Sequence, residues 1–565
     1  MQKSRKIPAI LTLLLGFFMA ILDTSIVNVA LPRMSEFYGA DTAGISWVVN
    51  GYSLSFAVFL LAASRLADQF GRKKAFMTGL FLFTLSSLLC GLAGSITSLI
   101  VFRVLQGIGA ALITPLVAPL LLALFPPEKK AVMMGITGAL AGLAAASGPA
   151  LGGVLSYQLD WQWIFYINIP IGALALVLAA SSLAESYDPT ATRKLDWGGM
   201  LTVSAASLTL TLAFMQANEK GWDSPYILSL FAAALVSLLL FLWIESRVKE
   251  PMLPLSLFRI KRFPSGNLGL FLLGIGMTGP TFILAFFLTQ VIGMTELRAG
   301  LIISVLAVAS MICSVLAAKG AAKLGPRIFS VTGMILLALG TYLLAGLTTE
   351  SSTMDYIWRL VIAGMGTGMA IANLTATTVL LPPPEKTTIA MGIGTMARTI
   401  GSALGIAVLV TLLSQSMQTE MASAKTELAE RIAGSSLSGE SKAGLAEALQ
   451  QAGSRRAASG SASGSMQGLL DQWDRKEREQ LQAASPDTAG RVKETFAKDK
   501  AELQGLLPQL QATLNTHTTA AFGLVFKVSC LALLLGAVCA FVNGRKAAEP
   551  AREAKRVENA LRSPQ

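Results

Sequence analysis

Long apolar runs alternate along the chain with short turns that contain charged residues, proline or glycine. A helix needs about 20 consecutive apolar residues to cross the hydrocarbon core of a membrane, and fourteen runs reach that length. The runs are centred near Leu15, Phe56, Phe83, Leu105, Leu143, Leu174, Ser207, Ala234, Met277, Leu306, Leu337, Thr367, Leu404 and Ala532. The pattern predicts an all-α polytopic membrane protein with fourteen transmembrane helices.

Composition agrees with this prediction. Of the 565 residues, 53% are hydrophobic and 14% are charged, and the mean hydropathy is +0.60. These values exclude a disordered, collagen-like or disulfide-rich secreted protein. The first run follows three basic residues, as the core of a signal peptide does, but it contains Asp23 and no small-residue cleavage site follows it. We therefore expect it to be retained as a helix.

The net charge of +12 is first a signal of topology, because Lys and Arg collect on cytoplasmic loops. With the segment 416–515 set aside, the basic residues divide 26 to 4 between the two sets of loops, and the richer set includes both ends of the chain. This predicts that both termini are cytoplasmic. The excess charge gives no reason to expect nucleic acid as a partner.

The residues needed for hydrolytic, metal-dependent or ATP-driven chemistry are missing. His517 is the only histidine, and the four cysteines (Cys90, Cys313, Cys530 and Cys539) lie inside apolar runs without metal-ligand spacing. The sequence contains no phosphate-binding glycine loop. We expect no enzyme activity, no catalytic residue, no metal and no cofactor.

The segment 416–515 does not fit a compact membrane protein, because it holds about a hundred mostly polar residues. Apolar spacing within 466–481 and 496–507 predicts helices, and the Ser/Gly/Ala-rich stretch 454–465 predicts a flexible turn between them. Two interpretations stay open. The segment is either a solvated external insert or a cap that handles the substrate.

Two short turns share a pattern that indicates an internal repeat. Residues 64–73 (SRLADQFGRK) follow the second run, and residues 318–327 (AKGAAKLGPR) follow the tenth. Aligning Gly71 with Gly325 matches basic residues at both ends, and similarity between halves is typical of transporters built from repeats. A glycine permits a tight turn, and Asp68 can lie near a helix N-terminus, where the helix dipole favours an anion.

Six segments together resemble a known family. They are 22–32 (LDTSIVNVALP), 64–73, 102–111 (FRVLQGIGAA), Gly142 with 147–153 (SGPALGG), 161–172 (WQWIFYINIPIG) and 250–258 (EPMLPLSLF). In this order they resemble the motifs of the major facilitator superfamily, and more narrowly its fourteen-helix drug:proton antiporter branch, the EmrB/QacA-like exporters. Ser64 stands where the gate motif usually has a glycine.

The resemblance implies a major facilitator fold with two six-helix halves and two extra central helices. The expected segments are an N-terminal half at 1–187, two linker helices at 188–247, the first five helices of the C-terminal half at 248–415, an extracytoplasmic and mostly helical insert at 416–515, the last transmembrane helix at 516–545 and a cytoplasmic tail at 546–565. The insert is longer than the branch usually carries, so the resemblance implies nothing about it.

Embedded charges are costly in a membrane and are usually functional. Asp23 lies in the first run, Arg103 in the fourth, Arg398 in the thirteenth and Lys527 in the last. A carboxylate in a low-dielectric cavity can take up and release a proton, so we expect Asp23 to serve coupling and substrate binding, with a structural ion pair as the alternative. The resemblance implies proton transfer for Arg103, whereas the residue alone equally suggests a tie between helices.

Other roles follow from the resemblance or from position. It implies a cytoplasmic gate at Asp68, Gly71, Arg72 and Lys73, an antiporter motif at Gly142, Gly148, Pro149, Gly152 and Gly153, and no defined role for Arg398. Polar residues expected in the cavity are Asn28, Asn50, Tyr52, Gln106 and Asn373. We expect Lys527 to extend toward the membrane interface. Gly148 and Gly152 allow close helix approach, and Pro149 permits a bend.

The resulting prediction is a proton-coupled exporter of hydrophobic drugs or lipophilic monocations that works by alternating access. Because the last six runs have no acid well inside them, a dication would be matched poorly. The alternative is an exporter of a lipid or endogenous amphipathic metabolite, with the insert shielding the cargo. The expected setting is the bacterial cytoplasmic membrane, and the expected state a monomer. A partner protein in the cell envelope stays open.

Overall fold

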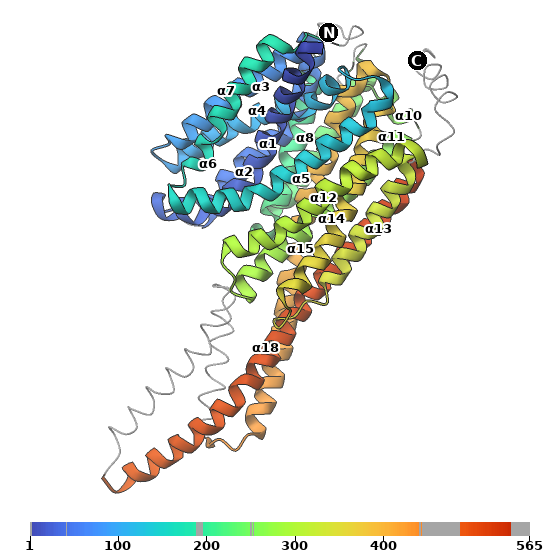
Figure 1. Ribbon diagram of the computed structural model, residues 1–565. Helices are drawn as coiled ribbons and strands as arrows, with labels where there is room; N and C mark the ends of the chain where they lie inside the picture. Colours follow the sequence, from blue (N-terminus) through green and yellow to red (C-terminus); the bar gives the residue numbers. More distant parts are fainter. Residues whose placement is uncertain are drawn as a thin grey trace.

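The computed structural model describes residues 3–40, 42–187, 196–248, 251, 253–260, 262–439, 442 and 486–543, and the elements in these residues are helices (Figure 1). Fourteen of them are long and apolar enough to cross a membrane. Each of the fourteen predicted centres falls within one of these spans, so the predicted crossings are confirmed. The predicted tail 546–565, the predicted turn at 454–465 and the helix predicted within 466–481 lie outside the described residues.

The N-terminal half contains six crossings, the sixth of which is interrupted. Its helices are α1 (Lys3–Tyr38), α2 (Thr42–Phe70), α3 (Arg72–Gly91), α4 (Ile96–Leu122), α5 (Pro127–Gln158), α6 (Trp163–Tyr166) and α7 (Asn168–Ser182). The break between α6 and α7 precedes Pro170, which has no N–H to donate to the carbonyl four residues earlier. The proline therefore lies in the first turn of α7, where a missing donor costs little.

Two further crossings separate the halves, and six follow them. The two are α8 (Trp197–Lys220) and α9 (Pro225–Arg247). The C-terminal half contains α10 (Ser256–Arg259), α11 (Arg262–Phe286) with the π-helix η1 (Phe287–Val291), α12 (Glu296–Leu324), α13 (Pro326–Leu344), α14 (Thr353–Leu380), the 3-10 helix η2 (Pro384–Lys386), α15 (Thr387–Gly434) and α18 (Pro486–Asn543).

The two halves repeat the same set of helix neighbours. In the N-terminal half α1 packs on α5, α2 on α4, and α3 on both α4 and α7. In the C-terminal half α11 packs on α15, α12 on α14, and α13 on both α14 and α18. Each N-terminal pair thus has a counterpart six crossings later when the two linker helices are left out.

The repeated turn has the same backbone geometry in both halves. Gly71 has φ 119° and precedes α3, and Gly325 has φ 88° and precedes α13. Positive φ values of this kind are strained for residues with a side chain. At Gly71 a Cβ atom would also lie only 2.7 Å from the carboxylate of Glu185, so both φ and space require glycine there.

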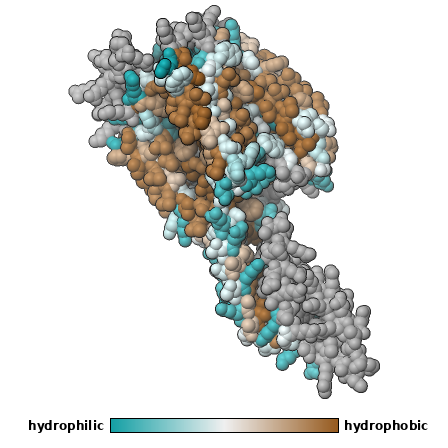
Figure 2. All heavy atoms as spheres, turned by 180° about the vertical axis from the view of Figure 1, so that it is seen from behind, coloured by the Kyte–Doolittle hydropathy of each residue, from teal (hydrophilic) through white to brown (hydrophobic). Residues whose placement is uncertain are grey.

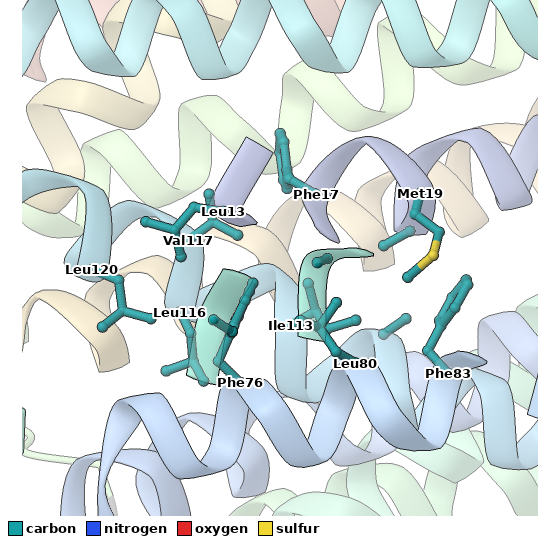
Figure 3. Close-up of a cluster of buried hydrophobic side chains, with 14 of the residues drawn as sticks. Leu13, Phe17, Met19, Phe76, Leu80, Phe83, Ile113, Leu116, Val117 and Leu120 are labelled. Atoms are coloured by element: carbon teal, nitrogen blue, oxygen red, sulfur yellow. The ribbon is translucent and has the colours of Figure 1, made fainter. Parts of the chain in front are cut away.

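Apolar side chains from α1, α3 and α4 form the largest packed region of the N-terminal half (Figure 3). Leu13 and Met19 of α1, Phe76 and Phe83 of α3 and Ile113 of α4 have no exposed surface. Burying such side chains stabilises the packing by roughly 1.5–3 kcal/mol each on a water-transfer scale. This core fixes the relative positions of the helices that carry the candidate site.

The outer surface of the bundle is apolar, as a lipid-facing surface must be. In Figure 2 hydrophobic side chains cover the helical body, while hydrophilic ones gather at its ends and on the projecting segment. The effect is strongest on α9, where only 17% of the apolar window is buried and Leu235, Leu239 and Trp243 are exposed. Helix α8, in contrast, bridges the halves: Ser204 donates a hydrogen bond to Val58 O of α2, and Asn218 donates one to Ala407 O of α15.

The halves also meet at one face of the membrane, the face at which α1, α3 and α5 begin, here called the basic face. There Ser314 Oγ of α12 donates a hydrogen bond to Gly135 O of α5 over 2.9 Å. Apolar side chains close the same region, with Leu122 of α4 and Met134 of α5 packing against Val379 of α14. Contacts between α5 and α12 make up the main interface between the halves.

Helices α15 and α18 run on past the opposite face as a pair (Figure 1). The apolar stretch 520–543 of α18 is long enough to cross the membrane, at about 36 Å, and α15 continues without a break past residue 415, the expected end of its crossing. We call the extensions beyond the membrane the hairpin. Leu428 and Ile432 of α15 pack against Leu503 and Leu510 of α18 inside it.

A charged cluster lies where the hairpin leaves the membrane. His517 Nδ1 lies 2.6 Å from Glu420 Oε2, and His517 Nε2 lies 3.3 Å from Glu427 Oε2. Hydrogen bonding to Glu420 raises the pKa of His517 above its ordinary value of 6.5. Hydrogen bonding from Arg431 lowers the pKa of Glu427 below its ordinary value of 4.5.

Candidate functional site

A buried ion pair lies inside the N-terminal half. Arg103 Nη1 of α4 donates to Asp23 Oδ2 of α1 over 2.5 Å, and the two side chains are 1% and 0% exposed. A charge-assisted contact of this kind offsets the cost of burying each charge only when the remaining donors and acceptors are also satisfied. The surrounding helices supply those partners.

Two side-chain amides complete the hydrogen bonding of Asp23. Gln106 Nε2 donates to Asp23 Oδ1 over 2.9 Å, and Asn168 Nδ2 of α7 donates to the same oxygen over 3.4 Å. Both amides also donate to Ser87 Oγ of α3, over 3.2 Å and 3.1 Å. The carboxylate therefore accepts hydrogen bonds from α4 and α7 together.

Arg103 has partners besides the carboxylate. Its Nε donates to Val48 O of α2 over 2.9 Å, and its Nη1 donates to Gln106 Oε1 over 2.6 Å. The guanidinium carbon lies 4.4 Å from the ring centroid of Tyr52 and 5.7 Å from that of Phe165. These carbonyl and aromatic contacts do not involve Asp23, so Arg103 has partners that are independent of the charge on that residue.

The pair lies toward the side of the membrane opposite the basic face. Asp23 is 17 residues beyond Lys6, where the first span begins, or about 25 Å along the helix. Arg103 is seven residues beyond Ile96, where the fourth span begins at the opposite face, or about 10 Å. The two estimates agree on the depth.

The expected cavity residues divide into two groups. Tyr52 and Gln106 belong to the buried network, and the Tyr52 hydroxyl donates to Ala20 O over 3.1 Å. Asn28 is exposed and bonds to Thr24 O in its own helix, Asn50 is half-buried, and Asn373 is buried in α14, where it donates to Met369 O. The structure thus places only two of the five next to Asp23.

The glycines of the fifth-helix segment pack against two different neighbours. A Cβ at Gly148 would overlap Ser25 of α1, and one at Gly152 would lie 2.7 Å from Ile26 O. Only Gly142 faces the other half, where a Cβ would lie 3.1 Å from Ala307 O of α12. Gly153 is half-buried in α5, and the Pro149 side chain lies outside the described part of the chain.

The residues of the expected gate contact both the N-terminal half and the C-terminal half. Arg72 Nε donates to Asp68 Oδ1 over 2.8 Å, and Arg72 Nη2 crosses to Glu385 O in η2 over 2.9 Å. Lys73 Nζ donates to Ala180 O. Glu185 accepts from the backbone N–H of Lys73 over 2.9 Å and so lies at the N-terminus of α3, where an anion is favoured.

The two remaining embedded charges differ in exposure. Lys527 is exposed on α18, in keeping with the expected extension toward the interface. Arg398 is half-buried on α15, and its backbone carbonyl would overlap a Cβ at Gly274 of α11. In the described residues its guanidinium has neither a hydrogen-bond partner nor an ion-pair partner.

Two functional candidates escaped prediction from the sequence. Asn168 lies within the quoted segment 161–172, but its neighbours depend on the break between α6 and α7, which the pattern does not locate. Glu185 follows the last apolar residue of the N-terminal half and looks like an ordinary loop acid. The signal that could have flagged Asn168 is an amide beside a helix-breaking proline within an apolar run.

Two similar helical halves around buried polar groups are typical of secondary transporters. The family model of the Major Facilitator Superfamily matches residues 13–406. The chain belongs to the major facilitator superfamily, and it is a transporter rather than an enzyme.

Relatives with descriptive names agree with this class. The chain is 32% identical over 418 residues to the multidrug transporter protein MdtP of Bacillus subtilis, which covers 73% of this chain and 76% of MdtP. It is 36% identical over 401 residues to the multidrug resistance protein Stp of Mycobacterium tuberculosis, covering 71% and 74%. It is 32% identical over 413 residues to the tetracenomycin C resistance and export protein of Streptomyces glaucescens, covering 73% and 77%. These names are consistent with the drug:proton antiporter branch.

Solved structures show the same fold at low identity. The human organic anion transporter MFSD10 superimposes with a TM-score of 0.52 at 16% identity, covering 72% of this chain and 93% of that one. The proton:xylose symporter XylE gives a TM-score of 0.52 at 14% identity, covering 72% and 88%. The major facilitator fold predicted from the sequence is therefore confirmed.

Proposed function

We propose that the protein is a proton-coupled antiporter that exports hydrophobic drugs or lipophilic monocations by alternating access. The observation that carries the proposal is the fully buried Asp23 carboxylate, paired with Arg103 and surrounded by donors within the membrane. Such a group favours one charge state in one environment and the other when the environment opens. The names of the multidrug and antibiotic exporters among its relatives support the substrate class.

Protonation of Asp23 provides the coupling step. A proton enters from the outer side, because Asp23 lies nearer to the face opposite the basic face. It neutralises the carboxylate and removes its attraction for Arg103. Arg103 keeps Val48 O and the face of the Tyr52 ring as partners. These contacts lower the free-energy cost of leaving the Arg103 charge buried while Asp23 is protonated. A cation in the cavity then competes with the proton for the same carboxylate, which links export of one to entry of the other.

The substrate expected from this arrangement is apolar with at most one positive charge. Asp23 supplies a single negative charge, and Arg103 lies beside it. A dication would leave one charge uncompensated in a low-dielectric site, which is costly. We propose the bacterial cell membrane as the location, with both termini cytoplasmic, because the basic residues gather on that side and the named relatives are bacterial.

The test uses purified protein in proteoliposomes with an imposed pH gradient and a lipophilic cationic dye. Wild type should export the dye in response to the gradient. Asp23→Asn should lose that response and bind the dye more weakly, because the carboxylate for which the cation and the proton compete is gone. Glu219→Gln is the matched control, because its side chain is 62% exposed and the change also converts an acid to an amide. Gradient-driven export by Asp23→Asn at the wild-type rate would refute the coupling role.

The alternative, export of a lipid or amphipathic metabolite with the insert as a shield, is less well supported. In the described part of the hairpin, apolar side chains such as Leu428 and Leu503 pack against one another and so are not available to line a path for acyl chains. Deleting 420–512 with a short linker is feasible because Glu420 and His517 are in contact. Dye export should survive this deletion, whereas selective loss of lipid transfer would favour the alternative.

A further inference from the structure

We propose that Asn168 is a positioning residue that stabilises Asp23 in both of its protonation states. The amide donates to the carboxylate and, after rotating, accepts from the carboxylic acid. The inference rests on the proposed role of Asp23 in proton coupling. It assigns a function to a residue at the start of α7 whose side chain is wholly buried.

The hydrogen bonds of Asn168 in the structure are those expected when Asp23 is a carboxylate. Asn168 Nδ2 uses its two N–H groups on Asp23 Oδ1, at 3.4 Å, and on Ser87 Oγ, at 3.1 Å. Asn168 Oδ1 is buried and has no hydrogen-bond partner. A buried amide oxygen without a partner costs about 1–3 kcal/mol, so its retention next to a titratable group calls for a functional reason.

A protonated Asp23 needs an acceptor that the other neighbours do not offer. Ser87 Oγ already accepts from Gln106 and Asn168 and gives its own proton to Phe165 O. Gln106 Oε1 already accepts from Arg103 and lies 3.8 Å from Cys90 Sγ. The unpartnered Asn168 Oδ1 is the acceptor that remains among these groups.

Rotation of the amide makes this acceptor available. Half a turn about the Cβ–Cγ bond exchanges Nδ2 and Oδ1 with almost no change in shape, because the two atoms are nearly isosteric. Oδ1 then accepts the new O–H of Asp23 in place of the two bonds that Nδ2 donates in the carboxylate state, while Ser87 Oγ keeps its bond to Phe165 O. The proton forms an O–H bond on Asp23 Oδ1 and leaves from the same atom, so nothing is oxidised or reduced.

The acid depends on Asn168 more than the carboxylate does. The bond donated to the carboxylate is long, and Gln106 donates to the same oxygen over a shorter 2.9 Å. Removing the amide therefore destabilises the protonated form by more. The expected result for Asn168→Leu is a shift of the pH midpoint of gradient-driven export toward acid by about one unit, the tenfold change that corresponds to one hydrogen bond.

The experiment measures dye export by purified full-length protein in proteoliposomes across a series of external pH values. Asn168→Ser restores a group that both donates and accepts, and it should return the midpoint toward wild type. Infrared spectroscopy gives a second readout, the C=O stretch of protonated Asp23, identified by its loss in Asp23→Asn. The band should move to higher frequency in Asn168→Leu because the acid has lost its acceptor.

Asn267→Leu is the matched control. Asn267 of α11 is also a buried amide with an unpartnered Oδ1, but its Nδ2 donates only to Phe263 O in its own helix. A wild-type midpoint and band in Asn168→Leu, or equal shifts in Asn267→Leu, would overturn the inference. Loss of coupling in Asp23→Asn alongside an unshifted Asn168→Leu refutes this inference alone, whereas retained coupling in Asp23→Asn refutes the proposed function.

Discussion

Arg72 offers the sharpest test of how the two halves are held together at the basic face. Its guanidinium joins Asp68 of its own half and the backbone carbonyl of Glu385 in the other half, with the side chain only 9% exposed. Arg72→Gln removes the ion pair and shortens the reach to the carbonyl. The contact between the halves should be lost, so the basic face should open more often.

The size of the effect follows from that single contact. A hydrogen bond from a charged donor contributes about 1.5–3 kcal/mol, and each 1.4 kcal/mol is a factor of ten. The ratio of closed to open molecules should therefore fall by about 10-fold to 100-fold. Arg72→Lys keeps the charge but lacks the planar fork that holds two partners, so it should open the side as well.

Spin-label distances measure this ratio directly. Labels replace Lys129 of α5 and Lys323 of α12, both exposed at the ends of these helices that lie at the basic face. The background has its four cysteines replaced by alanine. Lys74→Gln is the control, because Lys74 is an exposed basic residue in the same turn that meets Glu185 through its backbone N–H. Identical distance distributions in wild type and Arg72→Gln would refute the reasoning.

Two further predictions concern packing and pH. Gly107→Ala should lower the thermal midpoint of unfolding, because the new Cβ would overlap Ser55 Oγ and overpacking costs about 1–3 kcal/mol. Gly94→Ala is the control and should leave the midpoint unchanged, because a Cβ there would have nothing within 4 Å. Equal effects of the two substitutions would contradict the argument. Protonated His517 stabilises the hairpin base fully below its ordinary pKa of 6.5, and this stabilisation is lost as pH rises through its raised pKa. Hydrogen exchange at the hairpin base, corrected for intrinsic rate, should accelerate over that rise in wild type but not in His517→Gln, and parallel profiles would count against the cluster.

Much of the architecture could be predicted because it depends on local composition. Apolar run length places all fourteen crossings, and the paired glycines Gly71 and Gly325 mark equivalent turns, since positive φ leaves a trace in the sequence. An ion pair at Asp23 is one of the two sequence-based interpretations because buried charges need partners, but the sequence does not identify Arg103 as that partner.

The rest depends on tertiary geometry that no local pattern encodes. The partner of Arg72 is a backbone carbonyl at Glu385, and any residue type could have supplied it. Gly148 and Gly152 allow close approach as expected, but the choice of α1 rather than the other half as their neighbour follows from how α5 is rotated. Asn168 reaches Asp23 only because the sixth crossing breaks just before it.

The hairpin has a mechanical consequence. Since α15 is one continuous helix from the membrane to Gly434, the last 20 of its residues form an arm about 30 Å long that is fastened to the C-terminal half. A tilt of that half by about a tenth of a radian would swing the tip of the arm by about 3 Å. The arm thus converts a small rotation inside the membrane into a larger displacement outside it. A protein that binds the tip of the arm would therefore oppose the rotation without contacting the membrane-spanning helices.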